Sequence, residues 1–474
     1  YTGRMMLGCT LAVDCGRLTG RWDGMKRVAH VLKGTSCNIA IFLVLFTLQA
    51  CMFVVQVGPL TIPDPDMHPL STYALATGQS LNPPVKGKDK HGNAIKKQYL
   101  KGDDRLLMVP GAGNILVFDA LERAWRGDSL QDGQRSADIM PASQIVVPNE
   151  TRSNRSNAYF PLDYLPQAIG MKIAMLVNLS PYAQWQAARI SNSILYAIMG
   201  CFAIALLPRW KTLMALLLVI PPVAFVASSL MIDGMIVALS ACMVAAIAAI
   251  AGNKHVISLP CTVALGVLAW ALACEKLSYA FVAGAALFLP SAVMTVRRKV
   301  EFVGVAAVLM GVLYLPWSVL FSSSLAQVNV SHNMSVALSH PILTIGKIVR
   351  SMIFLGTYHL TQLPVWYTVM SVVLVLVWLA ALVYTVKTTG AVRMAPSAWV
   401  GKYRFLILAL VIAAAEIAAF VLFVGMTWND LESMSRFGVF QGIQGRYVLP
   451  VLPVFLLGLV IVDDRKVSQR ALAC

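Results

Sequence analysis

The chain has 474 residues, of which 58% are hydrophobic and only 13% are charged, and its mean hydropathy is +0.70. A soluble domain carries about 25% charged residues. These values exclude a soluble enzyme, a disordered regulator and a small disulfide-stapled module, and they predict a protein that crosses a membrane several times. None of the nine cysteines forms a CxxC pair or lies in the long polar region 58–188, so no disulfide framework is expected there.

Uncharged stretches of the length needed to cross a bilayer core of about 30 Å follow one another along the chain. They cover approximately residues 35–57, 190–208, 212–231, 234–251, 256–273, 277–295, 302–321, 365–386, 405–427 and 447–462. A further stretch, 341–358, contains Lys347 and Arg350 and is amphipathic, which is typical of an interfacial or re-entrant helix. The predicted fold is an all-α polytopic membrane protein with about ten transmembrane helices and a large extracytoplasmic loop.

The distribution of basic residues predicts the orientation. With ten spans and the N-terminus inside, most of the net charge of +16 lies in the inside segments, as the positive-inside rule requires. Counting 341–358 as a span would move the basic loop between Lys387 and Arg404 to the outside. The charge therefore indicates membrane topology and not nucleic-acid binding, and we expect a multi-pass protein of the plasma membrane with both termini in the cytoplasm.

This topology divides the chain into segments. They are a basic cytoplasmic segment 1–34, the first transmembrane helix 35–57, an extracytoplasmic loop 58–188, the bundle of remaining helices 189–463 and a cytoplasmic tail 464–474. Within the loop, Pro63–Ser80 and Pro161–Leu179 are predicted to form short helices near the membrane surface. Arg105–Val109 and Asn114–Val117 are predicted to pair as a hairpin through Pro110–Gly113.

Ionisable residues gather at the outward ends of the spans. Charged groups at membrane depth are costly and usually face protein or water, so this grouping predicts an outward-facing polar cleft. Three basic residues beside outer span ends also call for an anionic partner such as phosphate or carboxylate. The candidate catalytic residues are Asp64 and Asp66, and the candidate substrate-binding residues are His68, Arg189, Asp233, Lys276, Arg446 and Tyr447.

Each candidate also has a simpler explanation. Asp64 and Asp66 fit solvated loop residues before a surface helix, and Asp233 fits the N-cap of a span. The three basic residues fit side chains that extend to lipid headgroups. Asp64, Asp66 and His68 would form an oxygen-rich site suited to Mg²⁺ or Mn²⁺, and the sequence leaves metal binding open. Glu416, alone inside a span, fits a paired buried carboxylate or part of a translocation path.

Four stretches resemble, in order, the motifs of domain-of-unknown-function family 2142. Thr61–His68 resembles its Pro-Asp-Glu-Pro-x-His signature, and Pro161–Ala168 resembles its Tyr/Pro-rich segment. Ala187–Asn192 looks like its Arg-containing opening of the second span, and Gln444–Pro450 looks like its Gln-Gly-Arg-Tyr-x-x-Pro motif. The resemblance covers roughly residues 35–465. One departure is that the family's Asp-Glu pair is Asp64-Pro65 here, with the second carboxylate at Asp66.

The resemblance implies a function by analogy of fold, because the family is similar to membrane glycosyltransferases of the GT-C class and its members are associated with bacterial cell-surface polysaccharide assembly. The implied reaction transfers a sugar from a polyprenyl-phosphate carrier to an extracytoplasmic cell-surface glycan. Asp64 or Asp66 would be the general base, and Arg446, Arg189 and Lys276 would stabilise the leaving phosphate. A transporter or flippase of lipid-linked glycans is the alternative, and a non-catalytic scaffold for polysaccharide assembly is a third reading.

Overall fold

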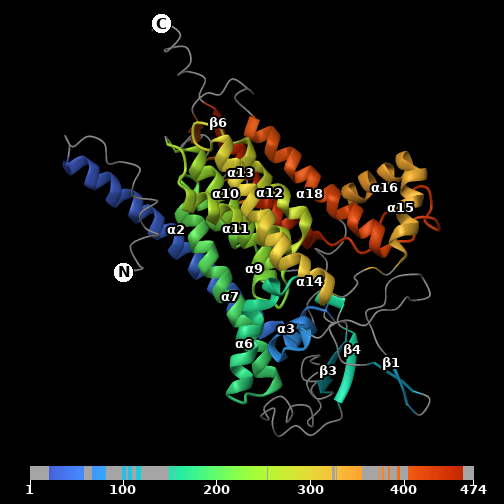
Figure 1. Ribbon diagram of the computed structural model, residues 1–474. Coiled ribbons are helices and arrows are strands. Elements are labelled where there is room, and N and C mark those ends of the chain that lie inside the picture. Colours follow the sequence, from blue (N-terminus) through green and yellow to red (C-terminus); the bar gives the residue numbers. More distant parts are fainter. Residues whose placement is uncertain are drawn as a thin grey trace.

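The computed structural model describes a defined part of the chain (Figure 1). The described residues are 21–57, 64, 67–81, 99–102, 105–108, 114–118, 149–153, 155–253, 255–322, 326, 328–354, 392–394 and 404–462, with isolated positions between 373 and 384; the side chains of 21–34 and of the short strands are not described. Asp66 and most of the predicted span 365–386 therefore lie outside the described residues. The described part is predominantly helical.

Five helical stretches are long and apolar enough to cross a membrane: Thr35–Gln56, Pro181–Leu206, Asp233–Ala251, Val296–Leu320 and Phe405–Trp428. They belong to α2 (Arg21–Gln56), α7 (Pro181–Leu206), α10 (Asp233–Ala251), the run from α13 (Val296–Leu309) through a π-helical turn to α14 (Leu315–Leu320), and α18 (Arg404–Trp428). The hydropathy of the sequence predicts all five, because about 20 apolar residues in one helix match the bilayer core.

Other predicted spans take a different form. The stretch 212–231 splits into α8 (Lys211–Leu218) and α9 (Pro221–Ala227), because Pro221 and Pro222 lack the N–H groups that a continuous helix needs. The stretch 256–273 becomes α11 (Leu259–Glu275), and 277–295 becomes the short turns η5 (Leu277–Tyr279), α12 (Ala280–Gly284) and η6 (Ala285–Phe288). The last stretch is a 3₁₀ helix, η8 (Gly445–Leu459), with two internal prolines. The total of ten spans stays a prediction.

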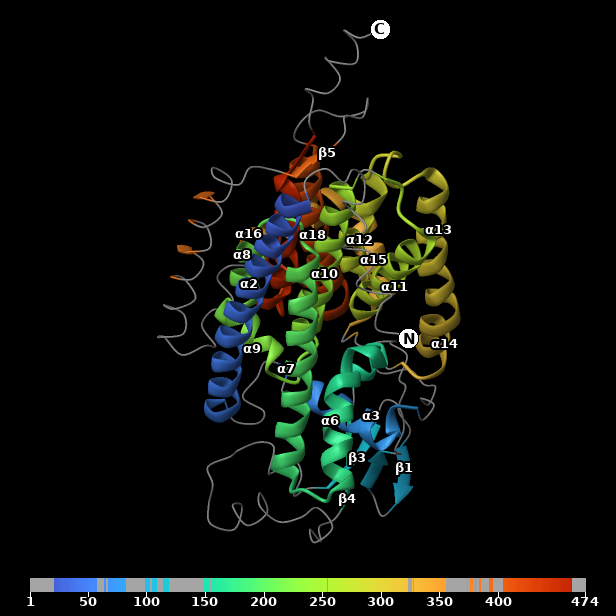
Figure 2. The same ribbon diagram turned by 90° about the vertical axis from the view of Figure 1, so that its left-hand side faces the viewer.

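The two short helices predicted in the loop 58–188 are present. The first is α3 (His68–Thr77), followed by the turn η1 (Gln79–Leu81), and the second is α6 (Leu165–Leu176), preceded by the turns η3 (Arg155–Ala158) and η4 (Pro161–Tyr164). Figures 1 and 2 show α3, α6 and the strands β1, β3 and β4 together at one end of the bundle. A Cβ atom on Gly170 would lie 2.4 Å from the carbonyl oxygen of Ala187, so glycine permits the close packing of α6 on α7.

The predicted hairpin is wrong in its pairing. The strands β2 (Arg105–Met108) and β3 (Asn114–Phe118) both form, but β2 pairs with β1 (Tyr99–Gly102) and β3 pairs with β4 (Asn149–Ser153), both antiparallel. Only two residues separate β1 from β2, and two-residue connections are the commonest in hairpins. At the other end of the bundle, β5 (Val392–Met394) pairs in parallel with β6 (Val460–Val462).

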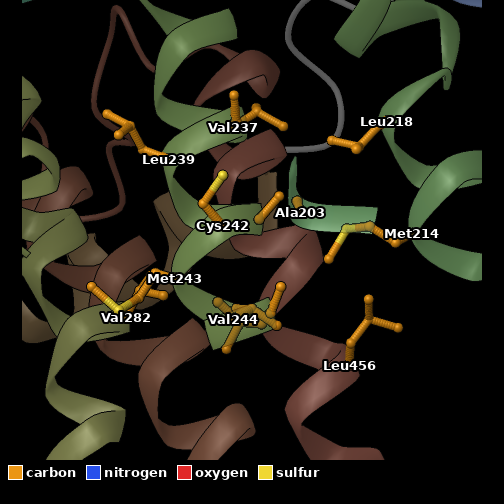
Figure 3. Close-up of a cluster of buried hydrophobic side chains, with 14 of the residues drawn as sticks. Ala203, Met214, Leu218, Val237, Leu239, Cys242, Met243, Val244, Val282 and Leu456 are labelled. Atoms are coloured by element: carbon orange, nitrogen blue, oxygen red, sulfur yellow. The ribbon is translucent and has the colours of Figure 1, made fainter. Parts of the chain in front are cut away.

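The central core lies around α10, whose side chains are buried on all sides. Figure 3 shows Val237, Cys242 and Met243 of α10 among Met214 of α8 and Leu456 of η8. Small residues let the neighbouring helices approach closely, which is the usual basis of helix packing in membranes. A core of this kind gives the ends of α10, α11 and η8 fixed positions relative to one another.

Candidate functional site

Four charged side chains from distant parts of the chain form one cluster, in which Asp233 is fully buried and the other three are partly buried. Arg446 donates a hydrogen bond from Nη2 to Asp64 Oδ2, and its Nε lies 3.1 Å from Asp233 Oδ2. Lys276 Nζ lies 3.1 Å from the other oxygen of Asp233. We call Asp64, Asp233, Lys276 and Arg446 the ionic cluster. It contains two carboxylates and two cations, so its formal charge is balanced.

The ends of several helices bring these four residues together. Asp233 is the first residue of α10, where the positive end of the helix favours a carboxylate. Lys276 directly follows α11, and Arg446 lies in the first turn of η8. Asp64 precedes α3 and has a φ of 51°, a left-handed backbone conformation that few side chains other than Asn and Asp adopt readily.

The side chain of Asp233 does not act as a helix cap. The residue that precedes α10 is Ile232, and no side chain caps this end of the helix. Both carboxylate oxygens of Asp233 instead face cations, Lys276 on one side and Arg446 on the other. The simpler reading of Asp233 as an N-cap is therefore wrong, because its charge is used in ion pairs.

Aromatic rings surround the two cations. Lys276 Nζ lies 4.4 Å from the centre of the Tyr447 ring and 5.6 Å from that of Phe420. The Arg446 guanidinium lies 5.0 Å from the Tyr447 ring, and Arg446 Nη2 donates to the Tyr447 hydroxyl at 3.2 Å. Cation–π contacts are strongest where water is excluded. Tyr447, a predicted substrate-binding residue, therefore contributes to holding both cations in place.

His68 is buried next to the ionic cluster. Its Nδ1 shares a hydrogen bond with the Tyr164 hydroxyl at 2.8 Å, and its ring stacks on Tyr159 at 6.3 Å. Burial, followed by the charge of Arg446, lowers the pKa of His68 to about 4, so the imidazole is neutral at pH 7. Among the residues that the structure describes, no three His, Cys, Asp or Glu side chains are placed to hold a metal ion. Metal binding that involves Asp66 lies outside the described residues.

Arg189 lies apart from the ionic cluster. It donates from Nε to Ser228 O, from Nη2 to Phe53 O and from Nη1 to Val57 O, each at 2.9 Å. The carbonyls of Phe53 and Val57 lie at the end of α2 and just after it, where a cation adds a favourable contact to the negative end of the helix. These contacts give Arg189 a structural role at the α2 end, and the structure does not bring it to Asp64 or Arg446.

The electrostatics of Asp64 depend on Arg446. Burial favours the neutral acid, but the charge of Arg446 and the hydrogen bonds from Arg446 and Gln444 outweigh burial and hold the pKa of Asp64 below its usual value. Gln444 Nε2 lies 3.4 Å from Asp64 Oδ1. Asp64 is thus ionised and only weakly basic while Arg446 is its partner.

Arg446 also has an unused donor. Its Nη1 is buried and has no hydrogen-bond partner in the described part of the chain. A buried guanidinium N–H without an acceptor is costly, and the planar guanidinium suits a phosphate or carboxylate that binds in a bidentate manner. The cluster therefore has the features of an anion site with a carboxylate at its edge.

Sequence reasoning missed Asp163 and, as a site residue, Glu275. Both are fully buried, their carboxyl groups interact, and neither forms an ion pair within the described residues. Burial raises the pKa of Asp163 well above its usual value, because an apolar environment favours the neutral acid. The signal available in the sequence is a single acidic residue inside the otherwise uncharged stretch Pro161–Ala168.

Apolar helices of membrane-spanning length and a partly buried ionic cluster at their ends define the class: this is a helical membrane protein with a polar site. The family model described as "Predicted membrane protein (DUF2142)" matches residues 46–455, and the chain belongs to this family. Neither a curated protein nor a solved structure matches the chain.

Proposed function

We propose that the protein is a GT-C-like membrane glycosyltransferase that transfers a sugar from a polyprenyl-phosphate donor to an extracytoplasmic cell-surface glycan. In this proposal it crosses the plasma membrane about ten times, with both termini in the cytoplasm. The single observation that supports it best is the contact between the carboxylate of Asp64 and Arg446, whose buried Nη1 has no hydrogen-bond partner among the described residues. Transfer from a lipid phosphate needs a cation that binds the phosphate and a base that reaches the acceptor hydroxyl, and these two side chains lie next to each other.

Arg446, Lys276 and Asp64 have separate roles in the proposed sugar transfer. Arg446 and Lys276 bind the phosphate of the donor and stabilise its charge as it leaves. Asp64 accepts the proton of the acceptor hydroxyl while the hydroxyl oxygen attacks the anomeric carbon. The bond between this carbon and the phosphate oxygen breaks, and its electron pair stays on the phosphate. A single displacement of this kind inverts the configuration of the sugar. Asp66 is the alternative base.

Donor binding also activates the base. In the structure, Arg446 is shared between Asp64 and Asp233. A phosphate that binds Arg446 competes with Asp64 for the guanidinium, and Asp64 is then left in a buried environment that raises its pKa. Asp233 keeps Lys276 and the Nε side of Arg446 in place during this exchange. Asp64 therefore becomes a stronger base only when the donor is present.

The test compares surface glycans in a strain that lacks the protein with those in the same strain carrying the wild type or Asp64→Asn, with equal expression in both. We expect one specific sugar branch to be lost, restored by the wild type and not restored by Asp64→Asn. Because Asp66 is the alternative base, Asp66→Asn and the double variant are included. Full restoration by all three variants would remove both carboxylates from the mechanism.

A flippase for lipid-linked glycans is the second candidate, and Glu416 favours it. This carboxyl group is buried in α18, and it has no ion-pair partner in the described part of the chain. Buried acids in membrane helices often line translocation paths. The same deletion strain separates the two functions: a flippase predicts that a whole polymer is missing outside while its lipid-linked precursor accumulates inside.

A further inference from the structure

The helices α15 (Val330–Ser339) and α16 (Pro341–Phe354) pack beside the end of α18 (Figure 1). The polarity of α16 is the reverse of that of a helix on a soluble protein. Of its polar residues, Lys347 is only 6% exposed, Thr344 and Ser351 are also buried and Arg350 is partly buried, whereas Ile342 is 83% exposed. Ile345 and Val349, on the same face as Ile342, are exposed as well.

The buried polar face of α16 binds the segment 429–443, which connects α18 to η8. Lys347 Nζ donates to Leu431 O at 3.1 Å and to Met434 O at 3.4 Å, and Ser351 Oγ accepts from the Phe440 N–H at 2.9 Å. These hydrogen bonds use the backbone of a segment that has no regular helix of its own. They hold this segment against α16.

The preceding helix, α15, binds the same segment. Asn333 donates from Nδ2 to Asn429 O at 2.6 Å and accepts from the Leu431 N–H at 3.0 Å. The segment held in this way ends immediately before Gln444 and Arg446, both of which contact Asp64. The position of Arg446 is therefore linked to the packing of α15 and α16.

The exposed apolar face of α16 is continuous with that of α18. Ile348 and Met352 of α16 pack in one cluster with Phe420 and Val424 of α18, and the neighbouring Phe423 is exposed. Because α18 is long and apolar enough to cross a membrane, its exposed face is a lipid-facing surface. With 14 residues, or about 21 Å, α16 is too short to cross the bilayer core.

We infer that α16 lies within one leaflet of the bilayer, with Ile342, Ile345 and Val349 against lipid acyl chains, and that Lys347 and Ser351 position the segment 429–443 that leads to Arg446. A contiguous exposed apolar face marks an interaction surface. Because this face is continuous with the exposed face of α18, we identify lipid acyl chains as its occupant. Lipid contact on the outer face leaves only the inner face for polar groups, which accounts for the reversed polarity. The inference does not depend on sugar transfer.

Photolabelling tests the lipid contact. The full-length protein is reconstituted in phosphatidylcholine vesicles that carry a diazirine in the acyl chain, and labelled residues are mapped by mass spectrometry. In a parallel sample, hydroxyl radicals label water-exposed residues. We expect lipid labelling at Ile342, Ile345 and Val349, as at the exposed Leu410 of α18, and none at Lys347. Radical labelling of the three apolar residues, or protection from both reagents, would contradict the inference, because it would indicate water or another protein chain.

Hydrogen–deuterium exchange tests the positioning role. Lys347→Met removes the donor while keeping the length of the side chain, so exchange in 429–443 is expected to rise about fivefold or more while exchange in α10 stays unchanged. Lys347→Arg should restore protection, and Lys172→Met, on the exposed surface of α6, is the matched control. If Lys347→Met fails to fold, Ser351→Ala frees the Phe440 N–H and serves the same purpose. Unchanged exchange in 429–443 would overturn the positioning role.

Discussion

Asp64 and Arg446 lie 382 positions apart in the sequence and form one ion pair. The pair leaves Arg446 incompletely satisfied, because its buried Nη1 has no hydrogen-bond partner among the residues that the structure describes. Side chains in a merely structural pair usually satisfy all their hydrogen bonds. At the scale of residues, the pair is therefore best understood as the resting state of a site that exchanges partners.

Removing Arg446 is expected to raise the pKa of Asp64. In Arg446→Gln the carboxylate loses its cation while burial remains, and burial favours the neutral acid. Infrared difference spectra of Arg446→Gln with and without Asp64→Asn, recorded across pH, follow the protonated carboxyl band of Asp64. The control is Arg297→Gln, which breaks the exposed pair with Glu301. A titration of Asp64 that is the same in Arg446→Gln and in the wild type would contradict the assignment.

The lowered pKa of His68 predicts that the folded protein loses stability in acid. Its pKa is about 4 in the folded protein and 6.5 in the unfolded chain, so the unfolded state takes up a proton first as the pH falls. The contribution of His68 to the free energy of unfolding is fully present above pH 6.5, and it falls by about 3 kcal/mol as the pH drops from 6.5 to 4. Thermal unfolding should show a smaller loss over this interval for His68→Gln than for the wild type. Equal losses would show that His68 is charged in the folded protein.

Asp163 predicts the opposite pH dependence. Its pKa is raised in the folded protein, so the unfolded chain releases the proton first and stability declines as the pH rises above about 4. Asp163→Asn keeps a neutral polar side chain of the same size and removes the loss of stability at rising pH. Its unfolding temperature should exceed that of the wild type by more at pH 8 than at pH 5. A difference that does not change with pH would contradict a protonated Asp163.

At the scale of elements, hydropathy predicts the long helices well, because a helix in lipid must satisfy its own backbone and show an apolar surface. The stretches 35–57, 190–208, 234–251 and 405–427 all became helices of spanning length. The failures have local causes. Pro221 and Pro222 divide one stretch, and β2 and β3 find other partners because hydropathy carries no information on strand pairing. The close packing of α6 on α7 at Gly170 could also not be predicted from one sequence.

Two glycines form a matched pair for testing helix contact. Gly170→Ala would place a Cβ 2.4 Å from Ala187 O and 2.6 Å from Ser191 Cβ, so α6 must move away from α7, at a cost of about 1–3 kcal/mol. Gly304→Ala in α13 meets no atom within 4 Å and is expected to stabilise the protein by about 0.5–1 kcal/mol. Denaturant or thermal unfolding distinguishes the two. Equal effects would mean that α6 does not pack tightly on α7.

At the scale of the whole molecule, the site forms where the ends of α10, α11 and η8 meet the segment before α3. Charge counting along the sequence predicts that Asp64, Asp233, Lys276 and Arg446 share one side of the membrane, and the structure brings these four into contact. A shared side does not determine distance, which is why Arg189 was grouped with them. Asp163 and Glu275 could not be paired from sequence, because Asp163 lies in η4 and Glu275 ends α11, and the sequence does not show that these two elements are adjacent.

The central claim is that a lipid phosphate and Asp64 compete for Arg446, and the most direct measurement is the affinity of the purified protein for farnesyl phosphate, a short lipid phosphate. The wild type should bind it, and Arg446→Gln should bind it at least about tenfold more weakly, since a charged hydrogen bond contributes about 1.5–3 kcal/mol. Asp64→Asn should bind more tightly than the wild type, because the competing carboxylate is gone. Weaker binding by Asp64→Asn, or equal binding by Arg446→Gln, would contradict the account.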